Sequence, residues 1–303
     1  IPAWDLVPMK KYWEIARPHG GGLKEGNVAY APVMFSRGCP YKCHYCHISK
    51  ELEGSLGGNT RKYRMKSINR IMKELNILKN LGVKYVFIED DSLLAKKERA
   101  KEIFKKVKEM GLQLADVNGI NLAHLCTNVD GKLGVDEPLM ESMAAAGFKR
   151  LQYPVESASQ RILDKYATGK LNLKKHNVIG LIKKAKQLGI EIVGNYTFGY
   201  PDETFVEMLK TLFLAKKHIA AGLDAANFMF ITPFPGTQLY DYAVEKNILR
   251  DDLNLESMDW TRPSMKTKVP GWFIRLVITK GWRWVNKPER INRIKGFSTT
   301  KNN

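Results

Sequence analysis

The sequence predicts an α/β fold in which parallel strands alternate with helices. Five times along the chain an amphipathic helical stretch ends in a glycine, and an apolar strand-like run follows within a few residues. A further apolar run, residues 28–35, precedes the first of these five units. Such alternation requires parallel strands with right-handed crossovers, which form either an open doubly wound sheet or a barrel. The six strands fall short of the eight in a closed barrel.

The elements follow one another in a regular order. After residues 28–35, the expected strands are residues 85–88, 112–115, 151–155, 190–193 and 225–230. The five glycines that precede them are Gly82, Gly111, Gly147, Gly189 and Gly222. Glycine just past a helix supplies the left-handed residue that lets the chain turn back. The first helix is typical, because apolar residues recur on one face from Ile68 to Leu78 and Ser67 precedes them as an N-cap.

Composition limits the class of protein. The 303 residues can hold one large α/β domain or two small ones, and no apolar run reaches the ~18–20 residues of a membrane span. Only four cysteines occur, which argues against a disulfide framework and favours a reducing, cytoplasmic compartment.

The positive charge of the chain is concentrated near its end. The formal net charge is +18, and the residues from Arg262 to Asn303 contain eleven Lys or Arg but one acidic residue. Binding to a polyanion would therefore depend mainly on this tail.

Three cysteines follow the first expected strand directly. Cys39, Cys43 and Cys46 form a C-x3-C-x2-C pattern within eight residues. Such close cysteines cannot easily form disulfides with one another, because a disulfide needs Cα atoms ~5.5 Å apart and converging Cβ vectors. They can hold an iron–sulfur cluster with one open iron, since a full set of thiolates is four. A zinc site completed by His44 or His47, or unligated thiols, are the alternatives.

A C-x3-C-x2-C trio with the aromatic Tyr45 before its last cysteine, after the first strand of a six-fold βα repeat, resembles the radical S-adenosylmethionine (radical SAM) superfamily. The resemblance covers about residues 1–250 and implies an open, partial (β/α)6 TIM-like barrel over residues 28–250. It also implies a 4Fe–4S cluster held by Cys39, Cys43 and Cys46, whose unique iron chelates S-adenosylmethionine (SAM). In the superfamily, reduction by a donor such as flavodoxin or ferredoxin splits SAM to a 5′-deoxyadenosyl radical.

Finer motifs are similar to the cobalamin-binding class of this superfamily. They are IPAWDLVP at residues 1–8, SRGCPY at 36–41, FIEDD at 87–91, VES at 155–157 and TPFPGT at 232–237. That class includes C-methylases and an oxidative cyclase of chlorophyll synthesis, and its cobalamin domain normally precedes such a first segment. Because the chain begins with Ile1, we expect residues 1–27 to be a linker from a preceding domain. No D-x-H-x-x-G cobalamin motif occurs, so cobalamin is a hypothesis here.

Two positions depart from the usual family pattern. Pro154 precedes Val155, where a glycine normally stands before the Glu-Ser pair, and Asp202 occupies a second position where glycine is commoner. Both departures concern the conformation of loops and leave the cluster ligands untouched.

The resemblance also implies contacts to SAM near the first two strands. Tyr45 is expected beside the adenine, with packing on the loop as the alternative. Asp90 and Asp91 end the second strand, where carboxylates can accept charge-assisted hydrogen bonds from the ammonium group of SAM. Helix N-capping is the alternative for Asp91.

Further contacts are expected on strands four and five. Glu156 and Ser157 resemble the pair that reaches the ribose and the methionine part of SAM, and a charged residue after an apolar run needs a partner if it is buried. Asn195 could face the cofactor, although simple alternation along a strand explains it equally well. Cys126 could meet substrate, but buried free cysteines are common packing residues.

The tail is a separate question. Residues 251–303 are expected as a basic, aromatic-containing C-terminal extension. Residues 271–285 mix aromatic, aliphatic and basic side chains, which suits peripheral contact with a membrane surface. A helix packed on the open edge of the barrel, or RNA binding, are the alternatives.

The sequence therefore predicts a radical SAM enzyme of the cobalamin-dependent, C-methylating type that acts on a small-molecule or lipid substrate. A radical methylthiotransferase acting on tRNA is disfavoured, because its second cluster needs cysteines that this chain lacks. Nucleic acid is accordingly not an expected partner. The rival from another class is a zinc-stabilised, non-catalytic binding module.

Overall fold

The structure is a computed structural model that describes residues 1–15, 28–48, 63–129 and 131–289. Its centre is a six-stranded sheet in the order β1-β4-β5-β8-β9-β10, and all neighbouring strands are parallel. The strands are β1 (Tyr30–Val33), β4 (Tyr85–Ile88), β5 (Gln113–Asp116), β8 (Phe148–Glu156), β9 (Glu191–Phe198) and β10 (Ala225–Phe230). This arrangement confirms the predicted partial (β/α)6 barrel and all six expected strands.

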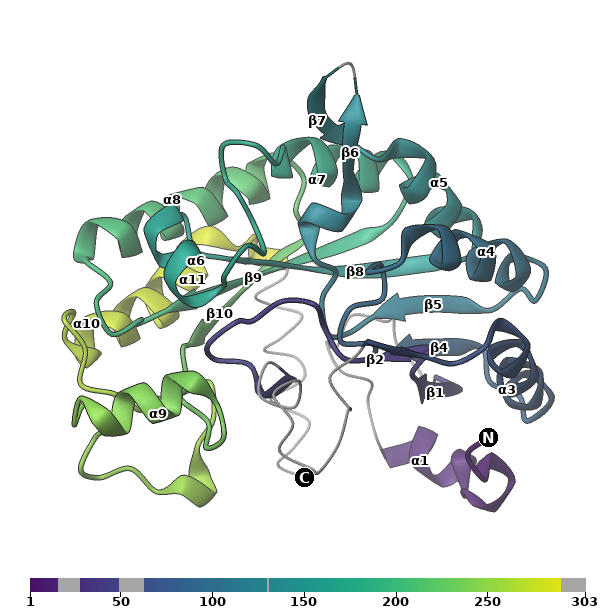
Figure 1. The fold of residues 1–303 in the computed structure, drawn as a ribbon, viewed down its shortest axis with the longest axis horizontal. Coiled ribbons are helices and arrows are strands. Elements are labelled where there is room, and N and C mark those ends of the chain that lie inside the picture. The colour runs from purple at the N-terminus through teal and green to yellow at the C-terminus, as the bar shows by residue number, and fades with distance from the viewer. Residues whose placement is uncertain (16–27, 49–62, 130, 290–303) are drawn as a thin grey trace.

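Helices cover one face of this sheet in the order of the chain (Figure 1). They are α3 (Ile68–Asn80), α4 (Lys97–Lys108), α5 (Glu137–Ala145), α7 (Val178–Gln187) and α8 (Phe205–Ala220). Shorter helices are η1 (Trp4–Leu6), α1 (Met9–Ile15), η2 (Leu122–Leu125), α6 (Gln160–Tyr166), α9 (Gln238–Glu245) and η3 (Leu255–Ser257). Of the expected linker, residues 1–27, the part 16–27 lies outside the described residues.

Local sequence signals explain where these helices begin and end. Ser67 accepts a hydrogen bond from Arg70 N at 3.2 Å and caps α3, whose buried side chains include Leu75 and Leu78 of the predicted apolar face. Gly147 has a φ of 98°, and a Cβ atom there would lie 2.4 Å from the Leu112 carbonyl oxygen. Only glycine therefore allows the close approach between the end of α5 and the start of β5.

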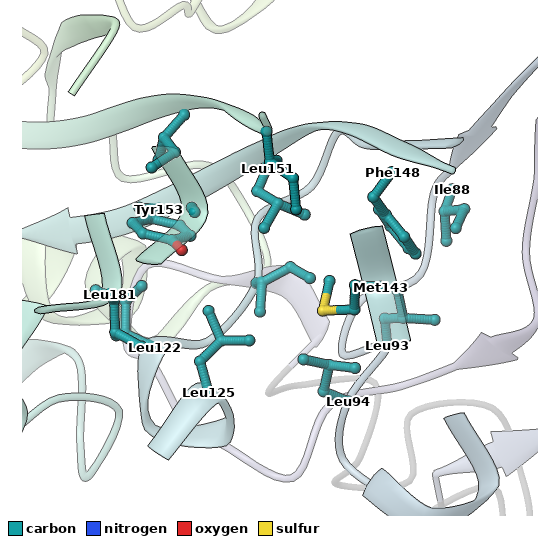
Figure 2. Packing of buried hydrophobic residues seen from close by; sticks show 14 of the residues in the cluster. Ile88, Leu93, Leu94, Leu122, Leu125, Met143, Phe148, Leu151, Tyr153 and Leu181 are labelled. Carbon is teal, nitrogen blue, oxygen red and sulfur yellow. The ribbon is translucent and has the colours of Figure 1, made fainter. Parts of the chain in front are cut away.

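The main core lies between the sheet and its helices (Figure 2). Figure 2 shows Phe148, Leu151 and Tyr153 of β8 pointing toward side chains that include Met143 of α5 and Leu181 of α7. Each of these five side chains is at most 2% exposed. Burial of a large apolar side chain contributes roughly 1.5–3 kcal/mol, so this layer holds the strands in the register that the site requires.

The structure extends two strands and adds two ribbons that the sequence patterns did not predict. β8 and β9 continue beyond the predicted residues 151–155 and 190–193, and a register shift interrupts their pairing between Pro154 and Glu156. The ribbons are β2 (Ser36–Arg37) with β3 (Arg64–Met65), and β6 (Cys126–Val129) with β7 (Lys132–Val135). Strands of two to four residues carry too little alternation to be recognised.

The tail packs on the open edge of the sheet. It forms α10 (Gly271–Leu276), the π-helical turn η4 (Val277–Gly281) and α11 (Trp282–Val285). Trp282 Nε1 donates to the Ala226 carbonyl oxygen of β10 at 2.9 Å. The side-chain amide of Asn286 accepts from the Ala226 N–H through Oδ1 and donates to the Ala226 carbonyl through Nδ2. These contacts satisfy polar groups of an edge strand, as in the predicted helix-on-edge alternative. Within the described part of the chain, no helix is long and apolar enough to cross a membrane.

Candidate cofactor site at the cysteine loop

The cysteine loop lies on the side of the sheet opposite the covering helices, at the carboxyl ends of the strands (Figure 1). Functional residues collect at this end in open and closed α/β barrels. The loop is held at its far end by two backbone hydrogen bonds of 2.8 Å. His44 N donates to the Tyr166 carbonyl of α6, and Leu239 N of α9 donates to the His44 carbonyl.

Asp90 and Asp91 fix the beginning of the loop. Asp90 Oδ1 accepts from Phe35 N at 2.6 Å, and its Oδ2 accepts from the Ser36 hydroxyl. Asp91 Oδ2 accepts from Gly38 N at 2.7 Å. Burial raises the pKa of Asp90 to about 6, although the bonds from Ser36 and Phe35 oppose this. The structure thus assigns both carboxylates to the backbone of the loop, and their contact with the SAM ammonium stays a prediction.

The three thiols of the loop share one electrostatic environment. Cys43 is buried, and Cys39 and Cys46 are half-buried. Burial raises the pKa of all three thiols, that of Cys43 to about 11, and the nearby Lys170 ammonium lowers each of them. Forming three thiolates here costs free energy because burial removes their hydration. The positive charge of Lys170 and that of a bound metal centre would both lower this cost.

The donor set fits a cluster better than a single ion. Three soft thiolates suit iron–sulfur ligation. His44 packs edge-on against Tyr166 with ring centroids 6.1 Å apart, and His47 lies 5.8 Å from the Phe234 ring. Both histidine rings thus lie against aromatic side chains, and the preference for a cluster depends on the three thiolates.

A buried ion pair adjoins the cysteine loop. Glu156 ends β8 with a φ of 67°, a left-handed conformation that is uncommon outside glycine. Its Oε1 accepts from Lys170 Nζ at 2.9 Å, and its Oε2 accepts from Thr197 Oγ1 at 2.7 Å. Burial alone would raise the pKa of Glu156, but Lys170 and Thr197 outweigh it and hold the pKa below its usual value.

Lys170 is the residue that sequence reasoning missed. Burial alone would lower its pKa, but Glu156 and Cys43 raise it well above the usual range, so the side chain stays charged. The residue follows the end of α6, next to Gly169, in a stretch without helical or strand periodicity. No local pattern distinguishes it from the many surface lysines of this chain.

Tyr45 lies where the cysteine loop meets the ends of the strands. Its ring is half-buried and packs against Tyr200 with centroids 6.3 Å apart, and its hydroxyl is buried. Glu156 and Cys43 both act on the pKa of this hydroxyl, which burial raises well above its usual value. Tyr45 and Glu156 thus lie close enough to the buried Cys43 for their charges to interact, while the contact of Tyr45 with adenine stays a prediction.

The remaining predicted residues, Asn195, Ser157 and Cys126, lie in three different environments. Asn195 belongs to a ladder of amides, in which its Nδ2 donates to Gln152 Oε1 at 3.0 Å and its Oδ1 accepts from Asn227 Nδ2 at 3.1 Å. Ser157 is fully buried, and its hydroxyl contacts Thr211 of α8 at 3.4 Å. Cys126 is buried at the start of β6, directly after η2, and its thiol donates to the Leu122 carbonyl at 3.5 Å. Their contacts with SAM or substrate stay predictions.

A family model described as the Radical SAM superfamily matches residues 33–215. The chain belongs to the radical SAM superfamily. The superfamily uses a 4Fe–4S cluster and SAM, and Cys39, Cys43 and Cys46 stay the predicted ligands of that cluster. Because the chain belongs to this superfamily, its enzyme class is that of the radical SAM enzymes.

Relatives of this radical SAM chain include named methyltransferases. An uncharacterized methyltransferase of Pyrococcus horikoshii is 31% identical over 88% of this chain and 51% of its own length. Cytidylyl-2-hydroxyethylphosphonate methyltransferase of Streptomyces wedmorensis is 27% identical over 89% of this chain and 47% of its own length. The chain thus spans about half the length of the curated relatives it matches.

A solved structure supports the fold. The radical SAM methyltransferase TsrM from Kitasatospora setae, with tryptophan substrate and a SAM analogue bound, matches with a TM-score of 0.62 at 14% identity. The match covers 86% of this chain and 52% of that chain. It agrees with the partial barrel described above.

Proposed function

We propose that this chain is the radical SAM core of a cobalamin-dependent enzyme that methylates carbon in a small-molecule substrate. The observation that carries the proposal is the match to named methyltransferases over 88% and 89% of this chain. The cobalamin-class motifs at residues 1–8 and 232–237 support it.

The chain's own residues would bind and orient SAM. Cys39, Cys43 and Cys46 would hold the cluster, which would supply, when reduced, one electron to the sulfonium of SAM. Lys170 donates one hydrogen bond to Glu156, and an ammonium group has three donors, so two remain to hold the carboxylate of SAM. The Gln152–Asn195–Asn227 ladder fixes its amides by mutual hydrogen bonds and offers polar groups to the rest of the ligand.

The proposed reaction predicts two products from SAM. The full-length gene product that contains this chain should be reconstituted anaerobically with iron, sulfide and cobalamin, and supplied with SAM and a strong reductant. We expect 5′-deoxyadenosine and, in the presence of cobalamin, S-adenosylhomocysteine, both measured by mass spectrometry. A matched sample without cobalamin should give 5′-deoxyadenosine alone. Equal S-adenosylhomocysteine in both samples would contradict the cobalamin dependence, and a zinc-only protein without sulfide would favour the binding module.

We further propose that one face of the molecule contacts an anionic membrane surface. An apolar patch, here called the α8–tail patch, is formed by exposed side chains of α8 and of the tail helices. They are Phe205, Val206, Leu209, Phe213, Trp272, Leu276 and Trp284, each 38–69% exposed. The two elements run side by side, since the Phe205 and Phe273 rings lie 4.8 Å apart and the Phe213 and Trp284 rings 5.5 Å apart.

Positive charge accompanies this patch. The same elements carry exposed basic side chains, namely Lys210, Lys217, Arg275, Lys280 and Arg283. Aromatic side chains at the headgroup level and basic residues near anionic lipids are the features of peripheral membrane contact.

Binding to vesicles tests the α8–tail patch. We expect the protein to co-sediment with phosphatidylserine-containing vesicles and much less with neutral vesicles, because each basic residue near the surface contributes about 1 kcal/mol. The double variant Phe213→Ser/Trp272→Ser should reduce binding roughly tenfold or more, since it removes two exposed aromatic rings. The control is Leu255→Ser, which removes a 52% exposed side chain of η3, outside the patch. Equal binding to both kinds of vesicle, or an equal loss in the control, would refute this contact.

A further inference from the structure

A cavity of about 650 Å³ opens at the end of β1, among η1, the β2–β3 ribbon and α3. Its apolar walls include Trp4 of η1, Met34 after β1 and Met65 of β3. Cavities of this size accept organic ligands of moderate size. Ser36 also lines the cavity, and it is hydrogen-bonded to Asp90, so the cavity adjoins the beginning of the cysteine loop.

Two arginines of the ribbon oppose one another at this cavity. Arg37 and Arg64 are direct cross-strand partners in the antiparallel β2–β3 pair, and both are exposed. Like charges directly opposite on a ribbon are destabilising. Neither side chain has a hydrogen bond or ion pair with another residue in the described part of the chain. Such a pair is compensated when an anion lies between the two guanidinium groups.

The other charged side chains leave an excess of positive charge. Lys66 and Arg70 also line the cavity, as do the carboxylates of Glu74 and Glu89. Glu74 is occupied, because it accepts from Lys66 Nζ at 2.7 Å and from Trp4 Nε1 at 3.3 Å. Glu89 also has an interaction partner, so its carboxylate is not free. Four cations therefore line the cavity with two carboxylates, both of which already have partners.

Hydrogen bonds from Arg99 of α4 hold the backbone of the β2–β3 ribbon, which carries the two arginines. Arg99 of α4 donates to the Lys66 carbonyl at 2.6 Å and to the Phe35 carbonyl at 3.2 Å, and so links the residues beside β3 and β2. Lys66 N also donates to the Phe35 carbonyl at 3.0 Å. Arg37 and Arg64 consequently project from a fixed backbone, which lowers the conformational cost of binding a ligand.

We propose that this cavity binds the phosphate group of an organic ligand. Arg37 and Arg64 hold the phosphate, for which the planar guanidinium fork is well suited. The organic body of the ligand lies against Trp4 and Met34. Two sources share this chemistry: a phosphate- or nucleotide-bearing substrate, and the nucleotide loop of a cobalamin.

Isothermal titration calorimetry on the full-length protein, without reductant or SAM, tests this site independently of the proposed reaction. We expect cytidine monophosphate to bind and cytidine, which lacks the phosphate, not to bind. Arg37→Gln or Arg64→Gln should weaken binding roughly tenfold or more, because each removes a charge-assisted contact. The control Arg275→Gln changes an exposed arginine of α10 outside the cavity and should leave binding unchanged.

Competition then identifies the source of the phosphate. If hydroxocobalamin displaces cytidine monophosphate and cobinamide, which lacks the nucleotide loop, does not, the site belongs to the cofactor. If neither displaces it, the site belongs to a phosphate-bearing substrate, and both results support the phosphate site. Absence of binding by both cytidine monophosphate and hydroxocobalamin would overturn the proposal, as would wild-type affinity in both arginine variants.

Thermal unfolding without ligand tests the role of Arg64 separately. The Arg64→Gln protein should melt no lower than the wild type, because the substitution relieves the repulsion between the two arginines. A lower melting temperature would mean that Arg64 stabilises the ribbon instead of binding a ligand.

Discussion

Replacing Cys43 by alanine should abolish the cluster and all SAM cleavage while the protein stays folded. Cys43 is the most buried of the three loop thiols, and an iron–sulfur cluster that loses one of only three protein ligands cannot be retained. After anaerobic reconstitution we expect loss of the iron and acid-labile sulfide found in the wild type, and no detectable 5′-deoxyadenosine. Circular dichroism should show unchanged helix content.

Cys126→Ala is the matched control for this experiment. Both cysteines are free and buried, at 7% and 5% exposure, but Cys126 lies on the β6–β7 side of the barrel rather than in the loop. We expect Cys126→Ala to lose about 1 kcal/mol of stability by packing and to keep iron, sulfide and cleavage. If Cys43→Ala kept its iron and sulfide, or if Cys126→Ala lost them, the assignment of the cluster ligands would be wrong.

Replacing Lys170 by methionine should both destabilise the protein and weaken its binding of SAM. The change leaves the Glu156 carboxylate buried at 7% exposure without its cation, and breaking a buried pair in this way costs about 3–5 kcal/mol. We expect the lower end of that range, because the Lys170 side chain is 18% exposed. Denaturant unfolding measures the first effect, and equilibrium dialysis with SAM the second.

A double variant and a second ion pair separate the structural effect from the functional one. Lys170→Met/Glu156→Gln removes both charges and should regain most of the lost stability without regaining SAM binding. Lys97 and Asp136 form a comparable pair with Nζ and Oδ2 2.9 Å apart, away from the cysteine loop. Lys97→Met should therefore cost stability and leave SAM affinity unchanged. SAM affinity that simply follows stability across these variants would reduce Lys170 to a structural role.

Several features of the site could be predicted because they are local in sequence. Cys39, Cys43 and Cys46 lie within one loop, and that loop follows an apolar run that forms β1. Glu156 was expected to need a partner because it follows a buried strand, and the structure provides Lys170 as that partner.

Other features depended on contacts between distant segments. Asp90 and Asp91 accept hydrogen bonds from backbone N–H groups more than fifty positions earlier in the chain, and no sequence pattern indicated these partners. The amide ladder of Gln152, Asn195 and Asn227 joins three strands that only the parallel register brings level. Hydrogen bonds between such distant residues produce no periodic pattern in the sequence, so they could not be predicted from it.

The sequence by itself determined the alternation of strands and helices, the cap of the first long helix and the place of the cysteine loop, because helical periodicity and glycine at helix ends are properties of short segments. The order of the strands within the sheet came from the structure. Only the tertiary structure decided which charged groups face one another. Arg37 and Arg64 became opposed when two short strands paired, and Lys170 became a neighbour of the thiols when α6 packed under the loop. Electrostatic energy depends on distance in space, and a chain position gives no measure of that distance until the core has formed.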